Sequence, residues 1–209
     1  MIKRVVIIVL LFTILLFAQK AKDIIDDVQE KYEDIDNFSA AFKQIETFKL
    51  TGSKNITDGK IYVKNGVKYR FETEDQKIIT DGKTIWTYNG INKQALIDKL
   101  TPGSGALLPR DVLFKYPKEY YATLLGSEKQ NGKKVFKLRL DPKKDIKSFL
   151  KAIKLWVENK SWLIKKIETT DVNGNTTIFE LNNIDIKTKL PDSLFQLQIT
   201  KDMHVVDMR

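Results

Sequence analysis

Residues 153–195 read IKLWVENKSWLIKKIETTDVNGNTTIFELNNIDIKTKLPDSLF, and this stretch decides the fold. Three runs rich in Ile, Leu, Val, Trp, Phe and Thr are separated by two polar turns, at 158–161 and 171–175. Gly174 in the second turn can adopt the positive φ that a tight reversal needs. Runs of this composition and length are typical of an antiparallel meander. Apolar residues occupy both parities of the runs, so we expect both faces of this sheet to be covered, by other parts of the chain or by a ligand.

The same turn signal recurs along the rest of the chain. Asn-Gly or Asp-Gly pairs separate β-rich runs at 58–59, 65–66, 81–82, 89–90 and 131–132. Such pairs between β-rich runs are the strongest short-range signal for a hairpin. We therefore predict a mainly β protein with some helix, built on a curled antiparallel up-and-down sheet of about ten or eleven strands.

Three segments have helical rather than strand spacing. Residues 21–35 place Ala, Ile, Val and Tyr on one side of an amphipathic helix, which we expect to pack on the core. Residues 106–116 are apolar and lie between the Gly-rich stretch 101–105 and Pro117, which predicts a short helix on a hinge. Residues 145–152 predict a second short helix. Helical segments over the mouth of an open, curled sheet are suited to holding an apolar ligand.

The N-terminus has the layout of a secretory signal peptide. The basic pair Lys3-Arg4 precedes an almost unbroken apolar run over residues 5–17. This run is shorter than the roughly 20 residues of a membrane-spanning helix. We expect residues 1–18 to be removed on export and residues 19–209 to form one domain, because no long linker divides them. An N-terminal segment that stays attached as an anchor is the alternative.

The residue inventory argues against several classes of site. The chain has no cysteine and one histidine, His204. A thiol nucleophile, a disulfide and a lipid attached to cysteine are therefore excluded. The usual ligands of zinc and other transition metals are missing, so we expect no metal and no cofactor. No catalytic group stands out, and we do not expect an enzyme. A hydrolase that uses scattered carboxylates is the remaining catalytic alternative.

The net charge of +9 points to more than one kind of partner. A basic balance suits an anionic surface, an acidic partner or nucleic acid, and it also occurs on an ordinary soluble surface rich in lysine. Because the chain has the features of an exported protein, we expect no nucleic-acid partner.

Several segments, in this order and spacing, make the chain resemble the LolA-type outer-membrane lipoprotein carrier proteins of the bacterial periplasm. The resemblance covers almost all of the chain that follows the predicted signal peptide, and no single segment is diagnostic. The segments are FSAAFKQ (38–44), GKIYVK (59–64), YRF (69–71), DGKTIWTY (81–88), NKQ (92–94), DVNGNT (171–176) and LPDSLF (190–195).

The resemblance implies an incomplete β-barrel with short lid helices, and a cavity between barrel and lid that shields the acyl chains of a lipoprotein. It also implies a periplasmic location, an inner-membrane release complex that supplies the acylated lipoprotein, and an outer-membrane acceptor. We expect a monomer. The alternative is a protein of the same fold that binds another lipid or a glycolipid, or senses envelope stress, without transporting lipoproteins.

Carried over by position, the resemblance implies an acyl-chain cavity lined by Phe42, Tyr69, Phe71, Trp86, Ile153 and Leu155. It implies a lid that contains Leu107, Leu108, Val112, Leu113 and Phe114. The family commonly has a basic residue followed by proline in the strand after Gly59, with an arginine that latches the lid. Here Lys64-Asn65-Gly66 stands at that place, and Arg70 is the candidate latch.

Overall fold

The computed structural model describes residues 20–101 and 119–209, which contain one long helix and a twelve-stranded sheet. The helix covers residues 20–33. The strands are β1 (Asn37–Thr47), β2 (Lys54–Lys64), β3 (Lys68–Thr73), β4 (Gln76–Thr80), β5 (Thr84–Asn89), β6 (Gln94–Lys99), β7 (Tyr120–Gln130), β8 (Lys133–Pro142), β9 (Leu150–Glu158), β10 (Ile164–Asp171), β11 (Thr176–Asp185) and β12 (His204–Asp207). A short 3-10 helix, η2 (Asp192–Phe195), precedes β12. The expected signal peptide and the expected lid segment, 106–116, lie outside the described residues.

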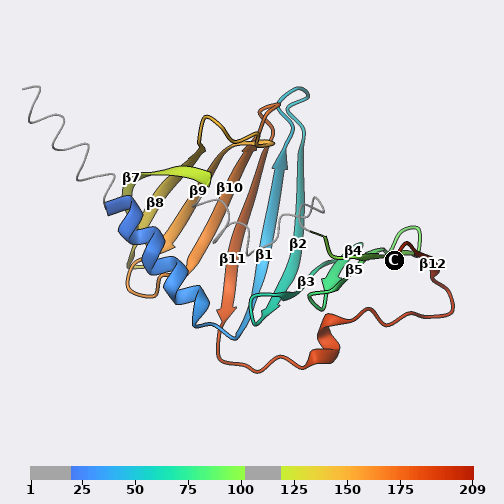
Figure 1. The fold of residues 1–209 in the computed structure, drawn as a ribbon. Helices are drawn as coiled ribbons and strands as arrows, with labels where there is room; N and C mark the ends of the chain where they lie inside the picture. Colours follow the sequence, from blue (N-terminus) through green and yellow to red (C-terminus); the bar gives the residue numbers. More distant parts are fainter. Residues whose placement is uncertain (1–19, 102–118) are drawn as a thin grey trace, which may run out of the picture.

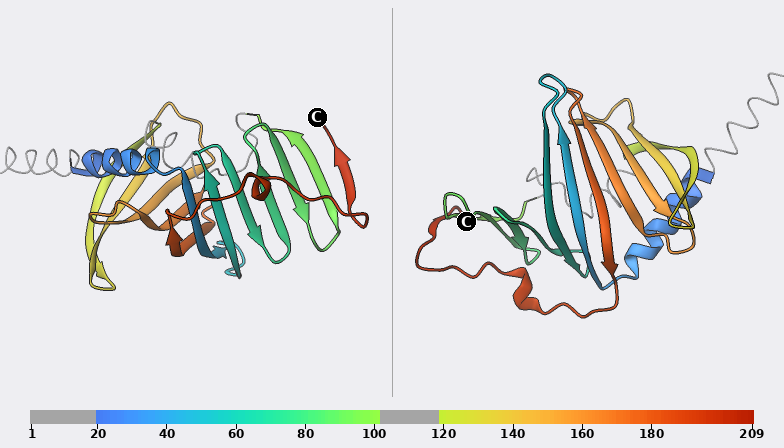
Figure 2. Two further views of the ribbon diagram at one scale, coloured as in Figure 1. Left: turned by 90° about the horizontal axis from the view of Figure 1, so that it is seen from below. Right: turned by 180° about the vertical axis from the view of Figure 1, so that it is seen from behind.

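The strand order is β12-β6-β5-β4-β3-β2-β1-β11-β10-β9-β8-β7. Strands adjacent in the sequence pair antiparallel, except β6 with β7 and β11 with β12, and β1 pairs with β11 to join the two halves of the sheet. Figures 1 and 2 show that the sheet is curled and open, which confirms the expected architecture. The predicted strand number was too low because it missed β12, which comes from the C-terminal tail and pairs parallel with β6.

The predicted helix over residues 145–152 is wrong. Residues 143–149 form a turn and irregular chain, and β9 begins at Leu150, which pairs with Asp171 of β10. The hydroxyl groups of Tyr120 and Ser148 contact each other, and the Ser148 hydroxyl also accepts a hydrogen bond from the Leu150 amide. These contacts and the strand pairing override a local pattern that would suit a helix.

The N-terminal helix packs on β8, β9 and β10. Ala21, Ile24, Ile25 and Val28 are at most 5% exposed and follow helical spacing, as predicted for the amphipathic helix. They share one core cluster with β-strand residues, which include Leu138, Leu140, Ile153, Leu155, Val157 and Ile164. At the end of the helix, the Tyr32 hydroxyl accepts a hydrogen bond from the Ile164 amide, at 3.2 Å. Burial raises the pKa of Tyr32 to about 12, against the smaller opposing effect of that bond.

The strand register assigns each residue to one of two faces, because directly paired residues project from the same side of a sheet. Leu155 pairs with Ile167, which pairs with Phe179, and Phe179 pairs with Gln44 of β1. All four therefore lie on the side that the N-terminal helix covers. We call this side the helix face and the opposite side the tail face.

The C-terminal tail, residues 190–203, crosses the tail face of the other half of the sheet (Figure 2). Phe195 in η2 is fully buried. Ile79 and Ile97 are also buried, and the register places them on the tail face together with Arg70. The sheet thus buries apolar residues on opposite faces in its two halves. Within the described residues, no helix is long and apolar enough to cross a membrane.

Candidate functional site

Three phenylalanine rings from three strands meet on the helix face, outside the core beneath the helix. Phe42 of β1 stacks on Phe71 of β3, with ring centroids 4.5 Å apart. Phe179 of β11 meets both rings edge-on, with centroids 5.9 Å from Phe42 and 6.4 Å from Phe71. These distances are favourable for aromatic pairs, so the three rings form one cluster. Phe42 is 3% exposed, whereas Phe71 and Phe179 are only partly buried.

The cluster depends on a glycine in β2. Gly59 pairs with Phe42, and a Cβ atom placed on Gly59 would lie 2.3 Å from the Phe42 ring and 2.4 Å from the Glu72 carbonyl oxygen. Such distances are far inside van der Waals contact. The absence of a side chain at Gly59 therefore leaves the space in which the Phe42 ring reaches Phe71.

Tyr69 extends this surface along β3. It lies two residues from Phe71, on the same face, and is 6% exposed. Its strand partners on either side are Val63 and Thr80, and Ile61 and Ile78 flank Phe71 in the same way. We call Phe42, Tyr69, Phe71 and Phe179 the aromatic wall. Aromatic and aliphatic groups in this arrangement can bury the apolar part of a ligand.

The structure brings together Phe42 and Phe71 from the predicted cavity residues and places Tyr69 on the same face. Ile153 and Leu155 also lie on the helix face, but they are 0% and 1% exposed in the core beneath the helix. Their side chains pack in one cluster with the N-terminal helix, and their role in a ligand cavity stays a prediction. Phe179 was not among the predicted residues, because its position opposite β1 follows only from the long-range pairing of β1 with β11.

Trp86 and Arg70 lie on the tail face, not with the aromatic wall. Arg70 pairs with Ile79, and Ile79 pairs with Trp86. In β5 the residue that shares a face with Tyr69 is Ile85, because Tyr69 pairs with Thr80 and Thr80 with Ile85. The prediction that Trp86 shares a surface with Phe71 therefore does not match the register.

The Arg70 guanidinium contacts its own strand and the tail. It donates to the Glu72 carboxylate at 2.6 Å and to the Leu194 carbonyl oxygen at 3.2 Å. Arg70 also lines a groove of about 430 Å³ between the tail face and the tail, with Leu194 and Met203 among the other lining residues. None of the six predicted cavity residues lines this groove. The five predicted lid residues, Leu107, Leu108, Val112, Leu113 and Phe114, lie outside the described residues.

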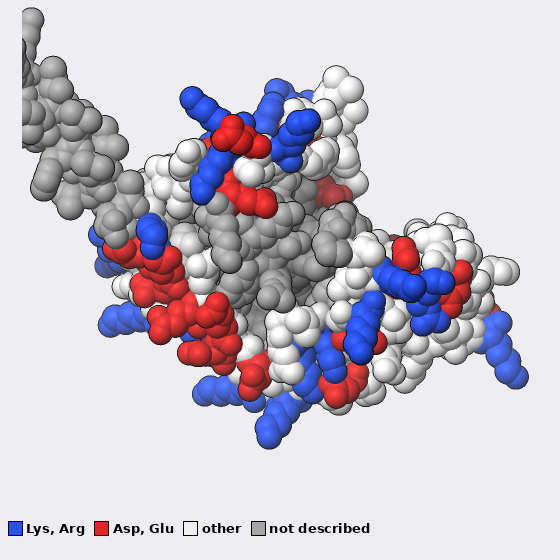
Figure 3. Space-filling view, in the orientation of Figure 1, with Lys and Arg blue, Asp and Glu red and all other residues white. Residues whose placement is uncertain are grey.

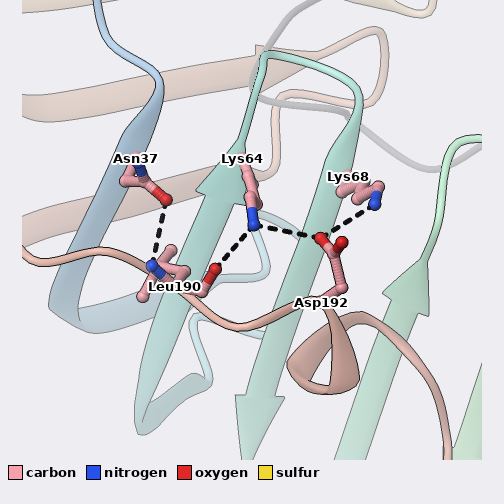
Figure 4. A network of polar contacts seen from close by, with 5 residues as sticks. All are labelled: Asn37, Lys64, Lys68, Leu190 and Asp192. Atoms are coloured by element: carbon pink, nitrogen blue, oxygen red, sulfur yellow. Dashed lines mark hydrogen bonds and ion pairs between the residues drawn. The ribbon is translucent and has the colours of Figure 1, made fainter.

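Lys64 anchors the start of the tail (Figure 4). Its ammonium group donates to the Leu190 carbonyl oxygen at 2.7 Å and to the Asp192 carboxylate at 3.0 Å. Lys68 donates to the same carboxylate at 2.9 Å, and the Leu190 amide donates to the Asn37 side chain. Hydrogen bonds from Lys68 and Lys64 lower the pKa of Asp192 below its usual value. Lys64, which stands where the resemblance led us to expect a basic residue followed by proline, thus fastens the tail.

Sequence comparisons agree with the resemblance. The family model described as outer membrane lipoprotein carrier protein LolA matches residues 33–198. The chain is 30% identical over 208 residues to an outer-membrane lipoprotein carrier protein of Legionella pneumophila (strain Corby), covering 98% of each chain. It is 27% identical over 192 residues to the protein of that name from Haemophilus influenzae, covering 90% of this chain and 88% of the other.

A solved structure shares the fold at low sequence identity. An uncharacterized conserved protein from Thermus thermophilus superposes with a TM-score of 0.62 at 15% identity. The match covers 90% of this chain and 99% of that chain. This likeness supports the open, curled sheet as a shared architecture.

Proposed function

The chain belongs to the LolA family of outer-membrane lipoprotein carrier proteins, and on that premise we propose that it carries the acyl chains of lipoproteins against its aromatic wall. The observation that carries this proposal is the Phe42–Phe71–Phe179 cluster, which presents apolar rings outside the core beneath the helix. The proposed place of work is the periplasm, between an inner-membrane complex that releases the lipoprotein and an outer-membrane acceptor.

Burial of the acyl chains supplies the binding free energy. Each methylene removed from water contributes roughly 0.8 kcal/mol, so ten buried carbons contribute about 8 kcal/mol. No covalent step and no cofactor is needed. Release requires an acceptor that binds the same chains more favourably, since a ligand moves to the site with the lower free energy. In this proposal the segment 106–116 covers the bound chains, as the sequence predicts.

The proposed contacts differ from those expected from the sequence alone. Phe42, Tyr69 and Phe71 stay in the set, and Phe179 joins it because its ring touches two of them. Ile153 and Leu155 lie in the core beneath the helix, and Trp86 lies on the tail face. The proposed ligand surface is therefore centred on β1, β3 and β11.

A fluorescent fatty-acid probe tests the wall. We expect the protein to bind the probe, and the variant Phe71→Glu to bind it at least tenfold more weakly, because a carboxylate would have to be buried beside the acyl chain. The matched control is Tyr88→Gln, an aromatic residue of β5 that the register places on the tail face. Equal probe binding by Phe71→Glu and the parent protein, or no binding by the parent, would contradict the proposal.

The identity of the cargo is a separate measurement. Native mass spectrometry of the protein purified from its own cell envelope reports the mass of whatever remains bound. A triacylated peptide is the expected ligand. An added mass that matches a free lipid or glycolipid would instead support the alternative, a lipid-binding protein that does not transport lipoproteins.

A further inference from the structure

Three loops meet at one end of the sheet. They connect β1 to β2 (residues 48–53), β8 to β9 (143–149) and β10 to β11 (172–175). The Lys49 amide donates to the Asn175 side chain at 3.1 Å, and the Val172 amide donates to the Phe149 carbonyl oxygen at 3.0 Å. Figure 1 shows the three connections side by side, at the upper end of the long strands. We call these three loops the loop end.

Each of the three loops of the loop end presents apolar side chains to solvent. Leu50 is 97% exposed, Phe149 is 66% exposed, and Val172 and Phe48 are 45% and 40% exposed. The loop that carries Leu50 is closed by backbone hydrogen bonds, from the Gly52 amide to the Phe48 carbonyl oxygen and from the Phe48 amide to that of Ser53. Leu50 is thus held outward at the tip of a bonded turn, where folding does not bury it.

Lysines lie close in the sequence to these apolar side chains. The loop end and the one strand residue on either side of each loop contain Lys49, Lys54, Lys143, Lys144 and Lys147. The acids within the same stretches are Asp145 and Asp171, and the Asp171 carboxylate accepts hydrogen bonds from the Asn173 and Asn175 amides of its own turn. The loops and their flanking residues thus carry more lysines than acids, and Figure 3 shows both lysine or arginine and acidic side chains at this end.

This combination selects one kind of partner. Protein–protein interfaces are depleted of lysine, whereas lysines among scattered Leu and Phe side chains suit the headgroup region of an anionic bilayer. There, the ammonium groups meet phosphates and the apolar tips reach the acyl region. We propose that the loop end docks on the surface of an anionic phospholipid bilayer, with Leu50 and Phe149 as the inserted side chains. This goes beyond the proposed carriage of acyl chains and does not depend on it.

The absence of cysteine in the chain permits a site-specific test with the full-length protein. Leu50→Cys labelled with an environment-sensitive fluorophore is mixed with vesicles of phosphatidylethanolamine and phosphatidylglycerol. We expect a blue shift that is lost with vesicles of phosphatidylcholine alone and reduced by high salt. The matched label is Lys129→Cys, an exposed position near the far end of β7, where we expect no shift. Any docking through the N-terminal apolar segment is common to both labelled proteins.

Affinity for the same vesicles gives a second readout. The double variant Leu50→Ser, Phe149→Ser should bind at least tenfold more weakly, because two apolar side chains no longer leave water. The control Val67→Ser changes an exposed apolar residue between Lys64 and Lys68 and should bind as the parent does. Because the changed side chains are exposed, an unchanged unfolding midpoint is expected for all variants.

Three results would overturn the docking proposal. The first is the absence of a shift at residue 50, and the second is an equal shift at residues 50 and 129. The third is a shift at residue 50 that needs a second envelope protein and does not occur with vesicles, which would make the loop end a protein-binding surface.

Discussion

The two halves of the sheet bury opposite faces, and the faces left over differ in chemistry. In β8–β10 the helix face is buried and the tail face carries charge: Trp156 lies between the ammonium groups of Lys137 and Lys166, each 4.9 Å from its ring centroid. In β2–β6 the tail face is buried, and Tyr69 and Phe71 of the aromatic wall lie on the helix face, beside Phe42 of β1 and Phe179 of β11. Lysine stems cover the leftover apolar surface in the first half. Where the two halves meet, the helix face instead carries the phenylalanine rings of the aromatic wall, which we propose as the surface for an apolar ligand.

The largest expected effect follows from placing a charge under the helix. Leu155→Asp should lower the free energy of unfolding by more than about 4 kcal/mol, because it leaves an unpaired carboxylate in the core. Urea unfolding measures the loss. Lys154→Ala, one residue away on the other face, removes only a partly exposed ion pair with Glu168 and should cost less than about 1 kcal/mol. Similar losses of unfolding free energy in the two variants would contradict the assignment of Leu155 to a buried face and of Lys154 to the opposite face.

The corresponding change in the other half is the truncation of Phe195. Phe195→Ala should lower the free energy of unfolding by about 3–5 kcal/mol, because this side chain of η2 in the tail is fully buried. The exposed neighbour Gln196 provides the control, since Gln196→Ala should leave the urea midpoint almost unchanged. A midpoint for Phe195→Ala that equals the control value would mean that the tail is not part of the folded unit.

A smaller effect is expected where the helix meets β10. Tyr32→Phe removes the acceptor of the Ile164 amide and should cost about 1–3 kcal/mol. Burial raises the pKa of Tyr32 from about 10 to about 12. The contribution of the buried, neutral tyrosine to the free energy of unfolding is therefore complete below pH 10 and declines as the pH rises toward 12. Unfolding measured across this range should show a steeper loss of stability in the parent than in Tyr32→Phe. Parallel curves would contradict the assignment.

The smallest effect concerns the anchor of the tail. Asp192→Asn should loosen residues 190–194, detected as faster amide hydrogen exchange there, with little change in global stability because the pair is exposed. Because the pKa of Asp192 is lowered in the folded protein, the stabilisation that its carboxylate gives to the tail is complete above the ordinary aspartate pKa. This stabilisation is lost as the pH falls through the lower pKa of the folded state. Ser193→Ala is the control, and equal exchange rates in the two variants would exclude Asp192 as an anchor.

Most of the predicted turns are confirmed, but the one at Asp58-Gly59 is wrong, because these residues lie within β2 and pair with β1. The predicted turns at Asn65-Gly66 and Asn131-Gly132 have positive φ at both residues, as their composition requires. The long-range pairing was not readable. Ile85 and Trp86 are both apolar, so alternation alone cannot say which of them shares a face with Phe71. That choice follows from register, which tertiary packing sets.

The same limit explains the other differences at the site. Ile153 and Leu155 were expected on a ligand surface because nothing local shows that the N-terminal helix covers them. Phe179 was not among the predicted residues because β1 and β11 are far apart in the sequence. β12 was missed because four residues of tail become a strand only where the edge of β6 is available.

The pairing of β12 with β6 also affects how readily the protein is expected to aggregate. An open sheet presents unpaired backbone groups along its edge, which recruit further strands and start aggregation. Here β6 is paired along Gln94–Ile97 by a strand of only four exposed residues, and Arg209 binds Asp207 just beyond it. A short, charged, parallel-paired edge is a poor template for another chain. The tail therefore covers an edge of the open sheet that could otherwise recruit a strand from another chain.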